Sequence, residues 1–413
     1  MTTLSVHKKS ILENGIRVVT KKLPHARTIS MGVWINVGAR DELPEQSGLS
    51  HFIEHMIFKG TATRSAYQIS KAFDAIGGQA NAMTSMEYTC FYARCYHTYL
   101  ERIIDLLSDM LLSSAFHTDE IIREKKVIGQ ELRMFEDDPE DYISFLSGKA
   151  FWGKHPVSRS ILGTQQLLDT FDTNIIRAFF NRHYSPQKIV IALAGNIVHD
   201  TLVDRFEKIF SNFSASEYPL SRTAPKPEPK TILEYRDLEQ VHLCLAGKGL
   251  HLNAPQRYVF TLLNIILGGN MSSILFQEIR EKHGLAYQVF SSPIMFTDTG
   301  MQSIYMGVHP SKVNDALNVI RETFDHLIQD SVSETRLAEA KEYTKSTIQL
   351  SEESVNNQMV RLGQSELIYH RYIRVKEIIE NIEKITPDDI QNMAKEVLDM
   401  DQMAVALLGP VKE

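Results

Sequence analysis

The chain has 413 residues, a length that suggests two or three domains with well-buried cores. Hydrophobic residues make up 43% and charged residues 23% of the chain, as in an ordinary soluble globular protein. The net charge is −7 and no dense block of Lys and Arg occurs, so nucleic acid is not an expected partner. No apolar run approaches the length of a membrane span and none resembles a signal peptide, so no membrane contact is expected.

The first elements along the chain are expected to be strands. Leu12-Glu-Asn-Gly-Ile16 carries the Asn-Gly pair of a tight hairpin turn, and Thr28–Val37 has the alternating, β-branched pattern of a sheet strand. Segments with apolar residues at helical spacing follow, over Ser65–Ala75, Thr98–Leu112 and Asp119–Phe135. This mixture of hairpins and flanking helices predicts an α+β layered fold.

The chain looks like two copies of one domain. Residues 189–196 resemble residues 403–410 at an offset of 214, and a similar helical segment precedes each of them. Between the copies, residues 214–230 contain four prolines, a composition that favours an extended, semi-stiff linker. We therefore predict three parts: an N-terminal domain over 1–213, a linker over 214–230 and a homologous C-terminal domain over 231–413.

The three cysteines do not point to a disulfide framework or a cysteine zinc site, because their number is odd and no C-x-x-C occurs. A reducing cytoplasm is the expected compartment. Cys90 and Cys95 lie five residues apart in a strand-like run, so they are expected on opposite faces of a sheet.

The most informative motif is His51-x-x-Glu54-His55, the inverted form of a zinc-protease helix motif. On a helix, His51 and His55 share a face and can bind one ion. Glu54 lies to one side of that face, where a general base for an activated water is needed. The alternative is a polar-edged helix with two surface histidines. At the offset of 214, the residues opposite the motif in the second copy are Ile265, Gly268 and Gly269. The second copy is therefore expected to lack the zinc ligands.

Two histidines need a third protein ligand, because a catalytic zinc leaves its fourth position open. Glu124 and Glu131 are seven residues apart on one expected helix, so both project from the same face. They are about 10.5 Å apart along the helix axis, so one zinc is not expected to take both. One of them would be the ligand and the other would orient a histidine. Spacing alone leaves the choice open.

At this point the chain resembles the inverzincin peptidases, which include pitrilysin, insulin-degrading enzyme and the mitochondrial processing peptidase. It is most similar to the compact bacterial members that resemble the β-subunit of the processing peptidase. The likeness covers nearly the whole chain, with five matching stretches: 12–15, 48–61, 77–84, 155–156 and 161–164. In that family the third zinc ligand is a glutamate 76 residues beyond the second histidine, which is Glu131 here, and Glu124 then matches a supporting glutamate.

The resemblance also implies a second half-site. The family's C-terminal half has an Arg and a Tyr seven residues apart that contact the substrate, and Arg280 and Tyr287 match them. Both side chains can donate hydrogen bonds to an oxyanion. Without the family, the simpler reading is a surface Arg and a half-buried Tyr at a helix-to-strand junction.

A peptide-binding edge strand is implied over residues 79–84, with four substrate-contacting positions: Asn81, Ala82, Met83 and Thr84. Such an edge offers unpaired backbone groups that a peptide can satisfy. The alternative is an ordinary interior hairpin.

The activity implied is that of a zinc-dependent endopeptidase with one Zn²⁺ per chain, acting in an enclosed chamber on unfolded peptides, basic ones among them. Because the family builds this chamber from four such domains and this chain has two, a homodimer is expected. Only Gly268-Gly269 stands where a non-catalytic family member has a long glycine-rich loop, so dedicated presequence recognition is not expected. The rival interpretations are a non-catalytic scaffold or peptide-binding subunit, and a catalytic subunit that needs a separate partner chain.

Overall fold

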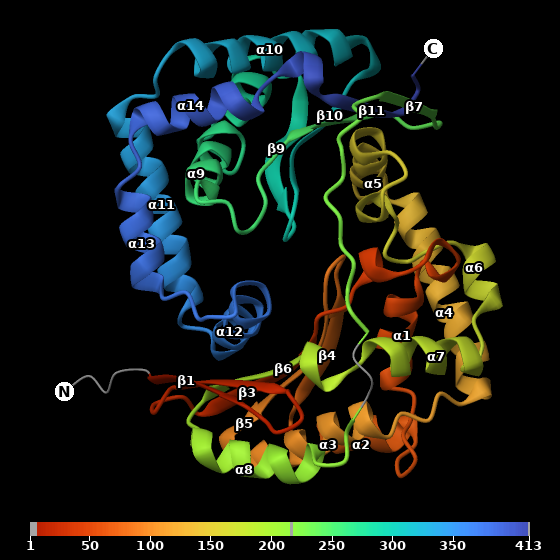
Figure 1. The fold of residues 1–413 in the computed structure, drawn as a ribbon. Helices are drawn as coiled ribbons and strands as arrows, with labels where there is room; N and C mark the ends of the chain where they lie inside the picture. The colour runs from red at the N-terminus through yellow and green to blue at the C-terminus, as the bar shows by residue number, and fades with distance from the viewer. Residues whose placement is uncertain (1–5, 215–217, 412–413) are drawn as a thin grey trace. The chain divides into compact units, whose positions relative to one another are not determined.

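The computed structural model describes residues 6–214 and 218–411, which fold into two compact units (Figure 1). The first unit takes residues up to Leu132 together with Arg159–Arg222 and Leu350–Tyr372. The second takes Arg133–Ser158, Thr223–Gln349 and the chain from Ile373 onward. The predicted domains, 1–213 and 231–413 with a linker over 214–230, follow the repeat in the sequence and differ from these compact units. That division stays a prediction.

A six-stranded mixed sheet, in the order β1-β2-β6-β3-β5-β4, forms the centre of the first unit. Its strands are β1 Val6–Ile11, β2 Arg17–Lys22, β3 Thr28–Ile35, β4 Gln79–Thr84, β5 Thr89–Tyr96 and β6 Ile189–Gly195. β2 and β6 run parallel and the other neighbours antiparallel. The predicted hairpin joins β1 to β2, and Gly15 in its turn has a φ of 97°, a conformation that glycine adopts without strain.

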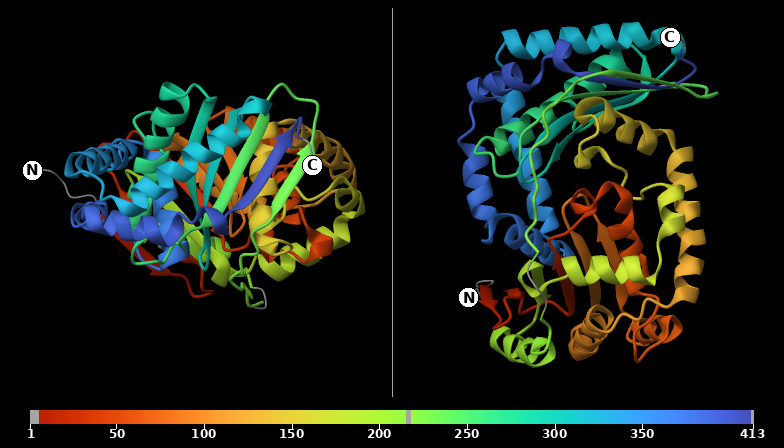
Figure 2. Two further views of the ribbon diagram at one scale, coloured as in Figure 1. Left: turned by 90° about the horizontal axis from the view of Figure 1, so that it is seen from above. Right: turned by 45° about the vertical axis from the view of Figure 1, so that its right-hand side comes forward.

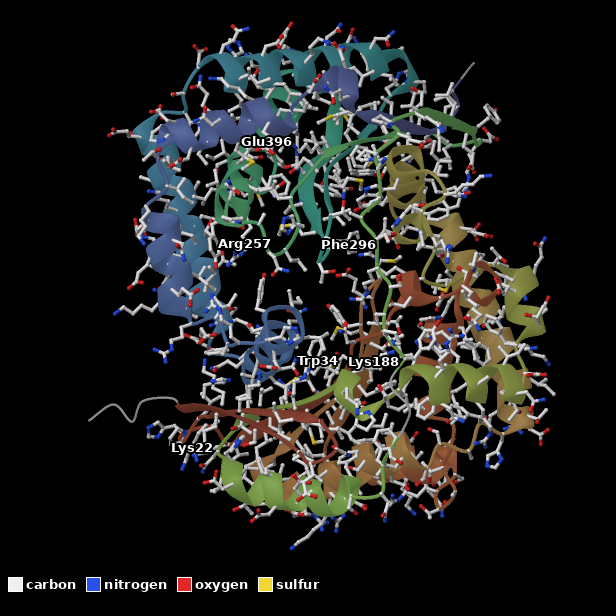
Figure 3. All side chains as sticks on the ribbon, viewed as in Figure 1. Lys22, Trp34, Lys188, Arg257, Phe296 and Glu396 are labelled. Carbon is white, nitrogen blue, oxygen red and sulfur yellow. The ribbon has the colours of Figure 1, made fainter. Side chains whose placement is uncertain are left out.

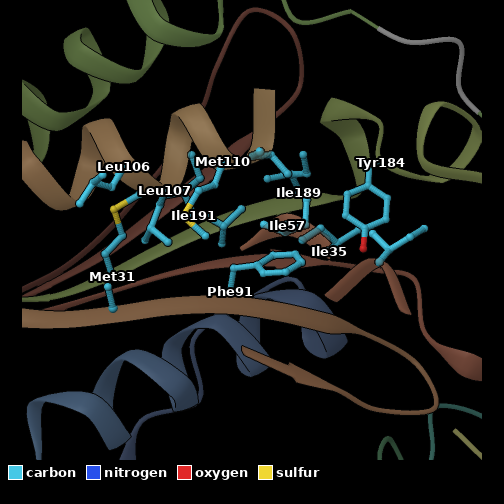
Figure 4. Packing of buried hydrophobic residues seen from close by; sticks show 14 of the residues in the cluster. Met31, Ile35, Ile57, Phe91, Leu106, Leu107, Met110, Tyr184, Ile189 and Ile191 are labelled. Atoms are coloured by element: carbon cyan, nitrogen blue, oxygen red, sulfur yellow. The ribbon is translucent and has the colours of Figure 1, made fainter. Parts of the chain in front are cut away.

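Helices cover one face of this sheet and enclose the main core of the unit. Figure 4 shows Leu107 and Met110 of a helix packed against Ile191 and Phe91 of the sheet. The helices of the unit are α1 Leu49–Ile57, α2 Ala66–Asp74, α3 Leu100–Leu112, α4 Thr118–Asp137 (which ends in the second unit), α6 Gln165–Thr170, α7 Thr173–His183, α8 His199–Phe210 and α12 Val355–Tyr369. The three helices predicted before residue 140 are confirmed as α2, α3 and α4, with small differences at their ends.

The opposite face of the same sheet is covered by α12, which comes from the C-terminal half of the chain (Figure 1). Trp34 is fully buried between this helix and the sheet (Figure 3). The contact is close, because a Cβ atom on Gly363 would lie 2.2 Å from Nε1 of Trp34. Cys90 belongs to this cluster and Cys95 to the core on the other face, which confirms that the two cysteines face opposite sides.

The second unit repeats this plan with a five-stranded sheet in the order β7-β11-β8-β10-β9. Its strands are β7 Thr231–Tyr235, β8 Val241–Lys248, β9 Ala286–Met295, β10 Gly300–Val308 and β11 Ala404–Gly409. β11 runs parallel to β7 and antiparallel to β8, as β6 does with β2 and β3. The two segments that resemble one another in sequence therefore occupy equivalent places in their sheets. Each half of the chain thus contributes a mixed α+β domain, as predicted.

Helices again cover both faces of this second sheet (Figures 1 and 2). On one side lie α9 Arg257–Leu267, α10 Val313–Gln329, α11 Glu334–Ser351 (whose last residues belong to the first unit), α13 Val375–Glu383 and α14 Pro387–Val397. On the other side lies α5 Pro139–Trp152, which comes from the N-terminal half of the chain. Each sheet is therefore completed by a helix from the other half of the sequence.

None of the helices in the described ranges, 6–214 and 218–411, combines the length and the apolar character needed to cross a membrane.

Candidate metal centre

The His-x-x-Glu-His motif lies on α1, as the sequence predicts. The apolar side chains of this short helix are buried, and the three motif residues lie on its other side, where they are only partly buried. The buried residues that hold α1 against the sheet are Leu49, Phe52, Ile53, Met56 and Ile57. Because this apolar face is fixed in the core, the polar face presents His51, Glu54 and His55 in one direction.

The N-terminus of α1 is held by Glu42, a buried residue that sequence reasoning did not single out. Its carboxylate accepts the backbone N–H groups of Gly48 at 2.9 Å and Ser50 at 2.6 Å. Its backbone oxygen accepts a hydrogen bond of 2.8 Å from Arg159. Burial raises the pKa of this carboxyl to about 8, and the two N–H donors act in the opposite direction. Glu42 thus serves as the missing side-chain cap of the motif helix.

Replacing Glu42 with alanine is expected to lower the free energy of unfolding by about 2–4 kcal/mol, because two buried N–H groups lose their acceptor. Chemical denaturation of the metal-free protein measures this change. Glu45→Ala is the matched control, since Glu45 lies exposed in the same loop and should change stability by less than about 0.5 kcal/mol. Equal stabilities of the two variants would contradict the capping role.

Three ligand atoms converge beside α1. The Oε2 atom of Glu131 on α4 lies 3.4 Å from Nε2 of His55 and 3.7 Å from Nε2 of His51. Within the part of the chain that the structure describes, these residues form the one group of three or more His, Cys, Asp or Glu side chains suited to a metal ion. All of their ligand atoms lie within 4.8 Å of one another.

This geometry fits a zinc ion. Zinc–nitrogen and zinc–oxygen distances of about 2.0–2.2 Å place neighbouring ligand atoms of a tetrahedron about 3.3–3.6 Å apart. The separation of 3.4 Å lies within that range and the separation of 3.7 Å just above it. Burial, and then the charge of His55, lowers the pKa of His51 to about 4, so His51 is neutral near pH 7 and its nitrogen can bind a metal. Two imidazoles and a carboxylate form a ligand set with room for water, as in catalytic zinc sites.

Glu124 lies behind His55 rather than in the ligand group. Its Oε2 atom is 3.0 Å from Nδ1 of His55, and its Oε1 atom is 2.7 Å from Nζ of Lys59. Burial raises the pKa of Glu124, but its bonds to His55 and Lys59 outweigh this effect and lower it overall. For His55, burial lowers the pKa, yet Glu124 and the other nearby carboxylates raise it overall. An ionised Glu124 therefore orients the His55 ring and leaves Nε2 free to face Glu131.

Replacing Glu124 with glutamine is expected to weaken zinc binding about 10- to 100-fold, because a neutral amide makes His55 a weaker ligand. Competition with a chromophoric chelator measures the zinc Kd. Glu136→Gln serves as control, because Glu136 is an exposed residue of the same helix. An unchanged Kd for Glu124→Gln would remove this residue from the metal centre.

His51 differs from His55 in how its ring is held. Its Nδ1 atom is buried and has no hydrogen-bond partner among the described residues. The two rings contact each other edge to face, with centroids 4.7 Å apart. Packing therefore sets the orientation of His51, whereas a hydrogen bond sets that of His55.

Glu54 lies beside the ligand group without being part of it. Its Oε2 atom accepts a hydrogen bond of 2.5 Å from Oγ1 of Thr84. Burial raises the pKa of Glu54, the Thr84 bond and the charge of His55 lower it, and Glu131 raises it, with a net increase. A carboxylate with a raised pKa next to a metal position suits a general base near neutral pH.

Strand β4 is the outermost strand of its sheet, as expected for a peptide-binding edge. It pairs with β5, from Gln79 opposite Arg94 to Thr84 opposite Thr89. On β4 the N–H of Ala82 donates to the side-chain oxygen of Asn81 at 2.9 Å. These features exclude the interior hairpin as an alternative. The roles of Asn81, Ala82, Met83 and Thr84 in binding a substrate stay predictions.

Arg280 and Tyr287 lie together in the second unit. The Arg280 guanidinium lies over the Tyr287 ring, 4.6 Å from its centroid, and also contacts the ring of Phe276. Arg280 belongs to a π-helical segment, Phe276–Lys282, a form of helix that occurs frequently at functional sites. Tyr287 is 77% exposed, so its hydroxyl is accessible, and the half-buried Tyr of the simpler reading is wrong.

Residues 17–165 match the family described as Insulinase (Peptidase family M16), and residues 170–343 match the Peptidase M16 inactive domain. A Bacillus subtilis protein named as an uncharacterized zinc protease, YmxG, is 38% identical over 403 residues, covering 98% of each chain. The chain belongs to peptidase family M16. A Streptomyces coelicolor protein, also named as an uncharacterized zinc protease, is 36% identical, and the match covers 98% of this chain and 90% of the relative.

Two solved structures share the fold over 98% of the chain. A protease from Helicobacter pylori superposes with a TM-score of 0.90 at 21% identity, covering 98% of this chain and 100% of the other. An M16 inactive domain protein from Pseudomonas fluorescens superposes with a TM-score of 0.92 at 18% identity, covering 98% of both chains. The inactive-domain match in the C-terminal half agrees with the absence of ligands from the second copy of the motif.

The sequence analysis missed Glu42, which caps the motif helix, and Lys59, which contacts Glu124. Lys59 lies just beyond the end of α1 and contacts Glu124, so helical spacing does not predict its role. Glu42 lies before the helix, at a place where no local pattern identifies a cap of this kind.

Proposed function

We propose that this M16 chain is a zinc-dependent endopeptidase that hydrolyses unfolded peptides. The observation that carries the proposal is the convergence of the ligand atoms of His51, His55 and Glu131. Glu54, the proposed base, lies on α1 with the two histidines. Its relatives named as zinc proteases support the same conclusion.

The chain's own residues have separate roles in this mechanism. His51, His55 and Glu131 would hold the zinc, which when bound would supply a Lewis acid for the peptide carbonyl and make water more acidic. Glu54 accepts the proton of the attacking water and then passes a proton to the leaving amine. Arg280 and Tyr287 donate hydrogen bonds to the oxygen on which negative charge develops.

We propose that the substrate binds as an added strand along β4. The edge position of β4 supports this, as does the Ala82 N–H, whose bond to the Asn81 side chain a peptide carbonyl can replace. Backbone pairing gives affinity with little side-chain preference, which suits a range of unfolded peptides. The net charge of −7 is compatible with basic ones. A peptide complex of the Glu54→Gln protein in which the peptide lies away from β4 would refute this docking.

We further propose that the chain works as a homodimer, in which the zinc half-site of one subunit meets Arg280 and Tyr287 of the other. Mixing His51→Ala chains with Arg280→Ala chains tests this arrangement. Hybrid dimers with one intact site are expected to recover activity. If heterodimers form and activity does not return, the shared site is rejected.

The decisive test of the activity is cleavage of a quenched basic peptide of about 10–20 residues, a length that an edge strand can bind. The purified chain is stripped of metal, assayed, reloaded with one equivalent of zinc and assayed again. Cleavage only after reloading establishes the activity. A zinc-loaded chain that cleaves no peptide in a broad set would favour a non-catalytic scaffold, or a catalytic subunit that needs a separate partner chain.

The cytoplasmic location expected from the cysteines stays a prediction. It is compatible with Cys90, Cys95 and Cys244, all of which are free and buried.

A further inference from the structure

The hydrogen bond from Thr84 to Glu54 joins two elements with different tasks. Thr84 is the last residue of β4, the proposed docking strand, and Glu54 is the proposed base on α1. The distance of 2.5 Å between Oγ1 and Oε2 indicates a short, charge-assisted bond. Both side chains are partly buried, so water competes for this bond less than it does at the surface.

The position of the Thr84 hydroxyl is fixed by the turn that follows β4. Ser85 donates its backbone N–H to the carbonyl of Tyr88 at 2.8 Å, which closes the turn. The carbonyl of Ser85 in turn accepts the N–H of Ala39 at 3.0 Å. This end of β4 is therefore tied to the loop before α1, which fixes the backbone that carries the hydroxyl.

A second contact ties the same turn to a buried cluster of charges. Arg40 donates to Oε1 of Glu87 at 2.5 Å, and both side chains are almost fully buried. Arg222 donates to the carbonyl oxygen of Glu87 at 2.7 Å and to both oxygens of Asp41. These bonds hold the turn that follows β4, and the bond from Thr84 to Glu54 joins this fixed end of the strand to the carboxylate.

We propose that Thr84 is a positioning residue for the catalytic base, a role beyond substrate contact. Its hydroxyl occupies one carboxylate oxygen of Glu54 and so directs the other toward the attacking water. Because Thr84 belongs to the docking strand, it fixes the base relative to a peptide paired along β4. This proposal rests on the proposed peptidase function, and it predicts that loss of the hydroxyl lowers kcat and leaves peptide affinity unchanged.

The test is a double-mutant cycle on the zinc-loaded full chain with a quenched basic peptide. Thr84→Val keeps the shape of the side chain without the hydroxyl and is expected to lower kcat about 10- to 100-fold, with KM within about twofold of wild type. Thr84→Ser is expected to recover most of this loss. In a Glu54→Gln background, Thr84→Val should cause no further loss, because the base is already absent.

Peptide affinity provides a readout that does not depend on turnover. The Kd of the peptide for zinc-loaded Glu54→Gln is measured with and without Thr84→Val, and the two values are expected to agree within about twofold. Thr347→Val, at an exposed position of α11, is the matched control for the substitution itself. If Thr84→Val unfolds or loses zinc, Thr84→Ala takes its place in the cycle.

Three outcomes would overturn the proposal, and they can be told apart. If Thr84→Val weakens peptide binding in the Glu54→Gln background, Thr84 is a substrate contact. If wild type cleaves peptides and Thr84→Val keeps its kcat, Thr84 does not position the base and the proposed function stands. If zinc-loaded wild type cleaves no peptide, the proposed function fails and the positioning role fails with it.

Discussion

Replacing Glu54 with glutamine is expected to reduce kcat/KM for peptide cleavage by about 10²- to 10⁴-fold while leaving one zinc bound per chain. The amide has the size of the carboxylate and cannot accept the proton of the attacking water. Glu54 lies outside the group of ligand atoms, and its Oε2 atom is bonded to Thr84, so metal binding should not depend on it. Cleavage rates and metal content are measured on the same zinc-loaded samples.

The matched control is Glu45→Gln, which makes the same chemical change at an exposed position before α1 and should leave the rate unchanged. Two results would contradict the assignment in different ways. A Glu54→Gln protein that keeps zinc and cleaves at the wild-type rate would show that another group is the base. A Glu54→Gln protein that loses zinc would place Glu54 among the ligands.

Local sequence patterns predicted some features of the metal centre and left others open. The spacing of His51 and His55 predicted that both would lie on one face of a helix, and α1 confirms it. The same kind of argument put Glu124 and Glu131 on one face of α4 without choosing between them. The structure brings Glu131 to Nε2 of both histidines and Glu124 to Nδ1 of His55. That choice depends on how α4 packs against α1, which is a tertiary property.

In the fold too, some features could be predicted from the sequence and others could not. Strands β2, β3 and β6, the Asn-Gly turn and the duplication all have clear sequence patterns, because alternation and turn residues act locally. The exchange of α5 and α12 between the two halves could not be predicted in this way. Each is a helix whose own sequence specifies an apolar surface but does not specify which sheet it covers.

Side-chain bonds between distant segments were the hardest features to anticipate. Thr84 and Glu54 are 30 residues apart, and Glu124 and His55 are 69 apart. No periodicity links such positions. The family resemblance implied that Glu124 is a supporting residue and Thr84 a substrate contact, and neither it nor the pattern of residues indicated the bond from Thr84 to the base.

Replacing Glu131 with glutamine is expected to raise the Kd for zinc by about a hundred- to a thousandfold and to abolish cleavage at limiting zinc. Zinc sites with four protein ligands are worth about 10–16 kcal/mol, so the loss of one charged ligand removes a large share of the binding free energy. Glu131 supplies the carboxylate of this ligand group, and its Oε2 atom lies within 3.7 Å of both histidine nitrogens. Competition with a chelator of known affinity measures the Kd.

Glu136→Gln on the same helix is the control and should bind zinc as tightly as wild type, because Glu136 is exposed and lies outside the ligand group.

The comparison with Glu124→Gln decides the roles of the two candidate glutamates. A larger loss for Glu131→Gln supports Glu131 as the ligand and Glu124 as the residue that orients His55. The reverse order would exchange these roles, and it would require α4 to shift along its axis by about 10.5 Å relative to α1. A movement of that size would break the bond between Glu124 and His55 and the contacts of the buried residues Ile121 and Ile128 with the core.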